Sequence, residues 1–285
     1  VNLKRLANFK TEKVIGIDVG AASVAMVQVV RKDGKYKITA AGTRHIPQSD
    51  NDTRQSREIK ILRAISECYN SCRMSAKNAV SSVTGPEVAI RNFEFPPLAS
   101  DELDGAVMLE ASQLCPFDIE KASVDYQLTR STDKKIGGVL VAATQNVIRQ
   151  KVRLVKNASF NCCLMDVDGL ALLNCLEQYR NGESDCQGAV LNIEDARGTL
   201  AVMLNDLPFI RDLVYASDSL AREIANKYMI PVEEADKIVD ESLETGQLPE
   251  EFEEVVSRWS SQLAEDVADT LRYYAAQDKS GAVKE

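Results

Sequence analysis

The chain has 285 residues, of which 45% are hydrophobic and 27% charged, a composition typical of a folded protein that is long enough for two compact halves. Its formal net charge of −9 argues against a nucleic-acid backbone as the main partner, because binding phosphates needs a basic face. No apolar run reaches the roughly 18–20 residues that cross a bilayer, and the start lacks a signal-peptide core, so we expect a cytoplasmic protein.

The first 85 residues predict a β-meander followed by a helix and a returning strand. The apolar run 14–20 is interrupted by two glycines and by Asp18, which falls at the end of the first predicted strand. Asp33-Gly34 is a hairpin-turn signal. The remaining predicted elements are strands over 26–30 and 35–41, a helix over 55–73 and a strand over 78–84. Together they predict one α/β layer.

From residue 86 the pattern changes to that of a small α/β insertion over 86–160. The expected elements are strands over 88–95, 123–130 and 138–143, a helix over 100–114 and a helix over 145–157. Ser100 is the predicted N-cap of the first of these helices.

The last part of the chain repeats the plan of the first part. Residues 164–168 predict a strand that returns to the first layer, and a helix over 169–180 follows. A polar linker over 181–188 then leads to a second meander with strands over 189–193, 198–204 and 208–214, and helices fill most of 217–277. We therefore predict a first half of 1–85 plus 161–186, an insertion over 86–160 and a second half over 187–285.

The seven cysteines include no C-x-x-C pair, and His45 is the single histidine. A tetrahedral zinc site needs about four such ligands at close spacing, so zinc is not expected. We expect reduced, mostly buried thiols.

Two β-hairpins that each open an α/β half are typical of actin-like nucleotide-binding folds. Backbone N–H groups in such turns bind phosphate oxygens, and an aspartate at the strand end holds waters of a magnesium ion. Three segments of the chain carry a family resemblance, namely 15–20 with Ser23, 88–117 and 165–168. Over about residues 12–280 the chain resembles the PilM-type actin-like proteins of type IV pilus assembly. This resemblance implies an α/β, actin-like (ribonuclease H-like) two-half fold with a small inserted subdomain.

The resemblance implies ATP and Mg²⁺ as cofactors and assigns residues to them. The cofactor-binding positions are Asp18, Gly20, Ala21, Ala22 and Ser23 in the first turn, and Asn192 and Asp195 in the second. Asp18 is the metal position. Asp168 is the catalytic position, as a metal-water contact or a water-positioning base. Its alternative role is that of an ordinary helix cap.

Several departures from the family pattern argue against an efficient ATPase. Ala21, Ala22 and Ala25 stand where the family has hydroxyl residues and a lysine, and Asn192 and Glu194 replace an aspartate and a glycine of the second motif. Asparagine lacks the charge that holds magnesium waters, and glutamate repels phosphate. Asp195 takes the place of the missing aspartate only if the second motif is shifted by one residue. The family's paired glycines near 216–217 are absent, and the family continues past the helix 259–276 into a strand and a glycine-rich turn, so we expect a truncated chain or a lost adenosine site.

The resemblance implies an assembly scaffold that binds the short cytoplasmic tail of an inner-membrane, PilN-like protein. The protein would then lie at the inner-membrane face and meet the membrane only through its partner, and it could form a homo-oligomer. The tail is expected to dock by strand addition with apolar pockets. The candidate contacts are Val88, Ile90, Phe93, Phe95, Met108 and Leu109. Core packing is the alternative role for each of these residues.

Three other functions stay open from the sequence alone. An active ATP-driven switch in the same machine needs different tail affinities in two states. An FtsA-like division protein is expected to carry an amphipathic C-terminal helix, which residues 279–285 do not resemble. A sugar kinase or hydrolase needs a deep substrate pocket with a catalytic base.

Overall fold

This computed structural model describes residues 13–32, 35–48, 51–131, 134–179, 188–204 and 207–277. The predicted Asp33-Gly34 turn, most of the predicted 181–188 linker and the residues beyond 277 lie outside these ranges. The chain divides into two compact units, the first of 1–190 with 201–210 and the second of 191–200 with 211–285. No helix among the described residues is long and apolar enough to cross a membrane.

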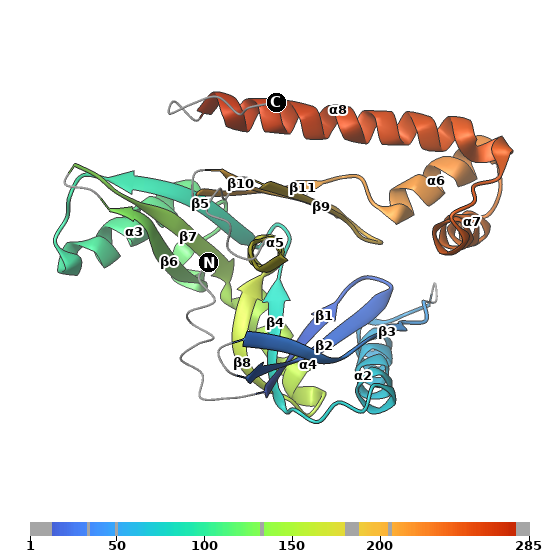
Figure 1. The fold of residues 1–285 in the computed structure, drawn as a ribbon, viewed down its shortest axis with the longest axis horizontal. Coiled ribbons are helices and arrows are strands. Elements are labelled where there is room, and N and C mark those ends of the chain that lie inside the picture. Colours follow the sequence, from blue (N-terminus) through green and yellow to red (C-terminus); the bar gives the residue numbers. More distant parts are fainter. Residues whose placement is uncertain are drawn as a thin grey trace. The chain divides into compact units, whose positions relative to one another are not determined.

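The first unit contains a five-stranded sheet whose strand order is β3-β2-β1-β4-β8 (Figure 1). Its strands are β1 (Lys13–Val19), β2 (Ser23–Lys32), β3 (Lys35–His45), β4 (Asn78–Val83) and β8 (Asn161–Val167). The predicted meander is confirmed, since β1–β2 and β2–β3 pair antiparallel. β4 runs parallel to β1, and β8 runs parallel to β4. β3 is longer than predicted and continues to His45.

Two helices, α2 (Arg54–Ser71) and α4 (Gln145–Asn157), pack against this sheet. Alternation in β1 and β2 places Ile15, Ile17 and Met26 in the core under them. The side chain of Thr53 caps α2 by accepting a hydrogen bond of 3.1 Å from Ser56 N. Because α4 packs on β4 and β8, the last helix of the predicted 86–160 segment contributes to the core of the first sheet.

A second, small sheet follows β4 in the chain and has the order β5-β7-β6. Its elements are β5 (Val88–Phe95), α3 (Ser100–Leu114), the short 3-10 helix η1 (Ile119–Lys121), β6 (Ala122–Ser131) and β7 (Ile136–Thr144). All its pairings are antiparallel. Gly138 is required in β7, because a Cβ there would lie 2.3 Å from Gln127 O and 2.6 Å from the ring of Phe93.

The helix α3 begins at Ser100, the residue predicted to be its cap, and so starts one residue earlier than predicted. Ala99, not Ser100, occupies the cap position, so the prediction for Ser100 was wrong. The carboxylate of Glu102 accepts a 3.2 Å hydrogen bond from Ala99 N, which satisfies an N–H group next to the helix start.

A third sheet, of order β11-β10-β9, follows the helix α5 (Asp168–Tyr179) in the chain. Its strands are β9 (Gly188–Ile193), β10 (Gly198–Leu204) and β11 (Leu207–Leu213). Within the first unit, Leu170 and Leu173 of α5 share a core with Ala201 of β10. A Cβ on Gly169 would lie 2.4 Å from the side chain of Ile210, so α5 approaches β11 closely there.

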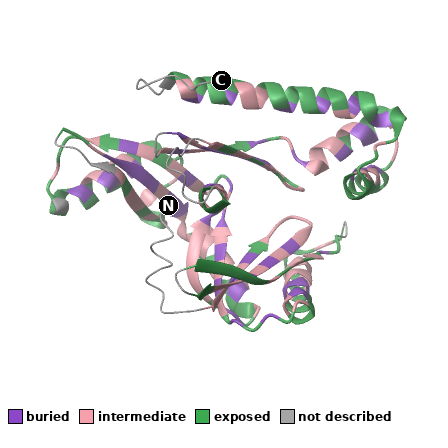
Figure 2. Cartoon of the chain, in the orientation of Figure 1, coloured by how far each residue is buried: buried purple, intermediate pink, exposed green. Residues whose placement is uncertain are grey.

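The helices of the second unit are α6 (Ser217–Tyr228), α7 (Val232–Thr245) and α8 (Glu253–Gln277), with a short 3-10 helix η2 (Glu250–Phe252) before α8. Their starts confirm the predicted breaks near Ser217, Pro231 and Pro249. Ile224, Val255 and Phe252 belong to their common core. Figure 2 shows this burial as stripes along the helices, typical of amphipathic helices with one solvent face.

Candidate functional site

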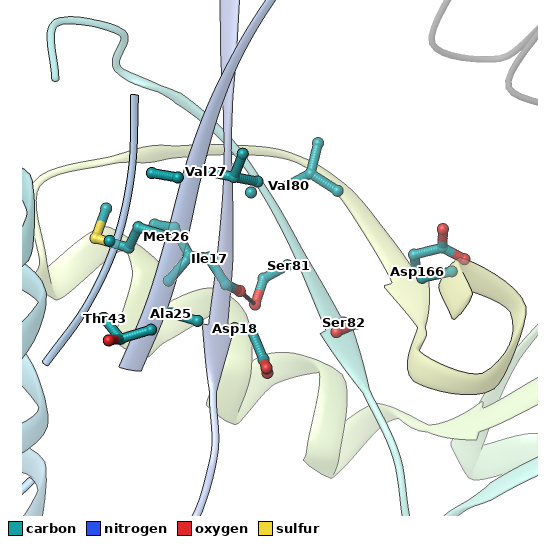
Figure 3. A pocket seen from close by; sticks show the side chains of 14 residues that line it. Ile17, Asp18, Ala25, Met26, Val27, Thr43, Val80, Ser81, Ser82 and Asp166 are labelled. Carbon is teal, nitrogen blue, oxygen red and sulfur yellow. Dashed lines mark hydrogen bonds between the residues drawn. The ribbon is translucent and has the colours of Figure 1, made fainter. Parts of the chain in front are cut away.

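A pocket of 610 Å³ lies on the first sheet and is called the Asp18 pocket below (Figure 3). One face of the sheet carries this pocket, opposite the face of Ile15 and Ile17. Residues paired in the register point to the same side, so this face contains Gly16 and Asp18 of β1, Ala25 and Val27 of β2 and Val80 of β4. The full lining is Gly16, Ile17, Asp18, Ala25, Met26, Val27, Ala41, Gly42, Thr43, Val80, Ser81, Ser82, Asp166 and Ala171.

Asp18 stands at the end of β1, where the sequence places the metal contact. Its side chain is reached by solvent, yet the pocket walls displace part of its hydration. This desolvation raises the pKa of Asp18, and repulsion from the carboxylate of Asp168 raises it further. The ammonium of Lys151 and a hydrogen bond from Val19 N act in the opposite direction. The Lys151 charge was not anticipated from the sequence, because α4 lies far along the chain.

Two further aspartates lie at the end of β8. Asp168 is the first residue of α5, one residue earlier than the predicted helix start, and the preceding strand ends at Val167. Asp166 lines the Asp18 pocket and accepts a 2.8 Å hydrogen bond from Val167 N. Desolvation raises the pKa of Asp166, the hydrogen bond from Val167 lowers it, and Asp168 adds repulsion. The fold therefore gathers Asp18, Asp166 and Asp168 at one edge of the sheet.

The described residues contain no group of three or more His, Cys, Asp or Glu side chains placed to bind a metal ion directly. A hydrated Mg²⁺ ion is commonly held by one or two carboxylates through its waters. The pair Asp18 and Asp168 fits that indirect mode, because a divalent cation relieves the repulsion between the two charges. The six cysteines that the structure describes are free thiols.

The first hairpin turn joins β1 to β2. Gly20 N donates a 2.9 Å hydrogen bond to Ser23 O, and Ile46 N donates a 2.7 Å hydrogen bond to Ala22 O. The guanidinium of Arg57 on α2 donates to Ala21 O. All five predicted positions of this turn thus lie together, and contacts from α2 and from the end of β3 hold their backbone.

The second hairpin turn, between β9 and β10, lies in the other unit. The amide of Asn192 donates a 2.6 Å hydrogen bond to the Glu194 carboxylate, and Glu194 N donates to Arg197 O at 2.9 Å. The backbone of Asp195 accepts a 3.0 Å hydrogen bond from Asp218 N, and its carboxylate accepts a 3.5 Å hydrogen bond from Ser217 Oγ. This turn carries the carboxylate of Glu194, so its residues do not fit a phosphate.

The six predicted tail contacts differ in exposure. Phe93 is only 4% exposed and lies in a core with Leu103 and Val107, so its side chain is not available to a partner in this structure. Val88, Ile90 and Phe95 are half-buried. Met108 and Leu109 on α3 are 44% and 62% exposed.

A second pocket, of 390 Å³, lies where η1 meets the start of α4 and is called the Phe117 pocket below. Its lining consists of Phe117, Asp118, Lys121, Thr144, Gln145, Asn146 and Arg149. Lys121 pairs with Asp118 at 2.9 Å, and the Arg149 guanidinium donates to the side-chain oxygen of Gln145 at 2.5 Å. Of these residues, Phe117 belongs to the block 88–117 that carries the family resemblance. The other lining residues carry no local signal for binding.

Comparison with protein families matches residues 16–285 to the family described as type IV pilus assembly protein PilM. Among solved structures, a PilM–PilN type IV pilus biogenesis complex is similar with a TM-score of 0.78 and 19% identity, over 94% of this chain and 79% of that chain. The ethanolamine utilization protein EutJ from Carboxydothermus hydrogenoformans is similar with a TM-score of 0.55 and 14% identity, over 93% of this chain and 74% of that chain. At these identities the structural likeness shows the fold, which is the predicted actin-like one.

Proposed function

The chain belongs to the family of the type IV pilus assembly protein PilM, and on that premise we propose that it is an assembly scaffold that holds the cytoplasmic tail of an inner-membrane protein at the membrane face. The similar solved structure is a complex of PilM with PilN, which supports a PilN-like partner. Family membership also favours this function over the FtsA-like and metabolite-kinase alternatives.

The observation that carries the proposal is the Phe117 pocket. It is formed by the small sheet's η1 side and by the start of α4, which packs on the first sheet. A pocket between two such elements is a common place for a side chain of a bound peptide. In the described sheet order β6 is an edge strand, which is the position that strand addition requires.

The lining of the Phe117 pocket sets the chemistry of the bound segment. Phe117 offers an aromatic contact for an apolar side chain. Gln145, Asn146 and Arg149 surround it with groups that hydrogen-bond a peptide backbone or a side-chain carbonyl. We therefore expect a tail segment that alternates apolar and amide-bearing residues.

Calorimetric titration with a synthetic peptide tests the proposal. The peptide is the cytoplasmic tail of a PilN-like inner-membrane protein from the same organism. Arg149→Ala and Phe117→Ala are each expected to weaken binding about tenfold, the typical effect of removing an interface anchor. Arg153→Ala is the matched control, because Arg153 lies on the same helix with a side chain 61% exposed and pairs with Glu58 at 3.5 Å. A wild-type chain that does not bind the tail contradicts the proposal.

A second candidate function is an ATP-dependent switch of the same machine, favoured by the carboxylates Asp18 and Asp168 beside the first turn. The alanines of that turn and the Glu194 carboxylate argue for weak or lost hydrolysis. Phosphate release that disappears in Asp18→Ala would support the switch. Undetectable ATP binding would remove it.

A further inference from the structure

The helix α3 has one face in the core and one in solvent. Its buried positions Leu103, Val107 and Ala111 recur every four residues and pack against Phe93 and Leu140 of the small sheet. The opposite face presents Met108 and Leu109, 44% and 62% exposed. They are adjacent apolar side chains on the solvent face of this helix.

Gly105 lies in the middle of this helix and is exposed. A Cβ added at Gly105 would meet no atom within 4 Å, and its φ is not among the positive values of this backbone. Neither internal packing nor conformation therefore requires glycine, although glycine in a helix interior destabilises it by about 1 kcal/mol relative to alanine. Glycine on a helix surface allows another backbone to approach closely.

These residues form one patch. Met108 and Leu109 follow Gly105 by three and four residues, which places all three on neighbouring turns of the same surface. We call Gly105, Met108 and Leu109 the Gly105 face. It combines apolar side chains with a bare backbone, which suits a peptide that lies across the helix.

The charge around the Gly105 face decides the occupant. The helix α3 contains Asp101, Glu102, Asp104 and Glu110 and no lysine or arginine. Asp101 and Glu102 also suit the positive end of the helix dipole, and Asp104 accepts a 2.6 Å hydrogen bond from the Tyr126 hydroxyl. A second copy of this chain would place acid against acid. The complementary partner is therefore cationic.

We propose that the Gly105 face holds the Lys/Arg-rich, membrane-proximal stretch of the partner tail, while the distal stretch occupies the Phe117 pocket. This inference rests on the proposed function. Cytoplasmic segments next to a membrane helix are enriched in lysine and arginine, which supplies the required charge.

The spacing along the chain is suitable for one continuous tail. The helix α3 ends at Leu114, and Phe117 of the pocket follows three residues later. Gly105 and Leu114 are separated by about 13–14 Å along the helix axis, at the usual rise per residue. About four or five extended residues cover that length.

Two synthetic peptides test the inference, both from the PilN-like membrane protein of the same organism. The short one contains the distal tail only, and the long one continues to the first residue of the membrane helix. We expect the long peptide to bind more tightly, by a margin that shrinks as salt is raised. We expect Gly105→Ala to weaken only the long peptide, about tenfold, while the melting temperature stays equal or rises.

Leu109→Gln is expected to have the same selective effect as Gly105→Ala. Leu243→Gln on α7 is the matched control, since Leu243 is 73% exposed on another helix, and it is expected to change neither affinity. If the short peptide binds but Gly105→Ala leaves the long peptide unaffected, the inference is overturned and the proposed function stands. If neither peptide binds the wild-type chain, both are overturned.

Discussion

The two hairpin turns of the chain share a plan and differ in chemistry. The penultimate residue of β1 is Asp18 and that of β9 is Asn192. The first turn contains small residues held by Arg57, whereas the second contains Glu194, whose carboxylate binds the Asn192 amide. The backbone plan is thus retained, while the carboxylate lies at the strand end in the first hairpin and within the turn in the second. The comparison shows that this scaffold accepts different charges at its two turns.

The glycines of the two turns also differ. A Cβ on Gly198, at the start of β10, would lie 2.5 Å from Tyr215 O, while a Cβ on Gly20 would lie 3.4 Å from Ser23 O. Tyr215 in turn packs edge-on against Trp259, whose ring N–H donates a 3.1 Å hydrogen bond to Ser219 Oγ. The second turn is thus tied into the helical core of its unit, and the first has room beside its glycine.

The largest expected effect is on the free energy of unfolding, when a methyl group is added at Gly198 and, for comparison, at Gly20. Gly198→Ala should lower the free energy of unfolding by about 2–3 kcal/mol, because the clash is with backbone that cannot move aside. Gly20→Ala is the matched control and should cost under about 1 kcal/mol. Urea unfolding of both variants measures the difference. Equal losses would show that the two turns are packed alike.

An intermediate effect is expected from restoring family residues in the second turn. Asn192→Asp combined with Glu194→Gly returns one carboxylate and removes another from the turn, so affinity for Mg-ATP should rise about tenfold. Equilibrium binding of a fluorescent ATP analogue measures it. Because one acid is gained and another is lost, the double variant keeps the net charge of the chain, and Glu194→Gly alone shows how much of the gain comes from removing the carboxylate of the turn. Unchanged affinity in the double variant would mean that the turn charge is not what limits nucleotide binding.

The smallest expected effect is on the free energy of unfolding when Asp18 is replaced by asparagine. The pKa of Asp18 in the folded chain is raised above 3.8, so the ionised carboxylate destabilises the fold at neutral pH, and this penalty disappears as pH falls below the unfolded value. Asp18→Asn should therefore raise stability near pH 7 by less than about 1 kcal/mol, because solvent screens the charge. The gain should vanish near pH 3. Denaturant unfolding at both pH values measures the gain. A variant that is less stable than the wild type at pH 7 would contradict the prediction.

The strands and the first turn could be predicted from the sequence because the information is local. Alternation around Ile15 and Ile17 marks β1, and the Gly20 turn follows directly. The cap of α3 was misplaced by one residue, because serine is a favoured cap residue and alanine is not, whereas the backbone of Ala99 is extended and that of Ser100 is already helical.

The features that could not be predicted from the sequence depend on contacts between distant segments. The helix α4 belongs to the first sheet because it packs on β4 and β8. In the sequence it directly follows the strands of the insertion, so it was predicted as part of the insertion. The Phe117 pocket joins residues 117–121 to residues 144–149, and neither segment has a binding motif of its own. The charge of Lys151 near Asp18 is hidden in the same way.

The most direct test of the account is a calorimetric titration of the wild-type chain with the partner's tail peptide, with and without Mg-ATP. Tail holding is the main role proposed for this chain, and the turn that carries Glu194 contributes little to it. We therefore predict saturable binding with nearly the same affinity in both conditions. Absence of binding, or binding that appears only with Mg-ATP, would contradict it.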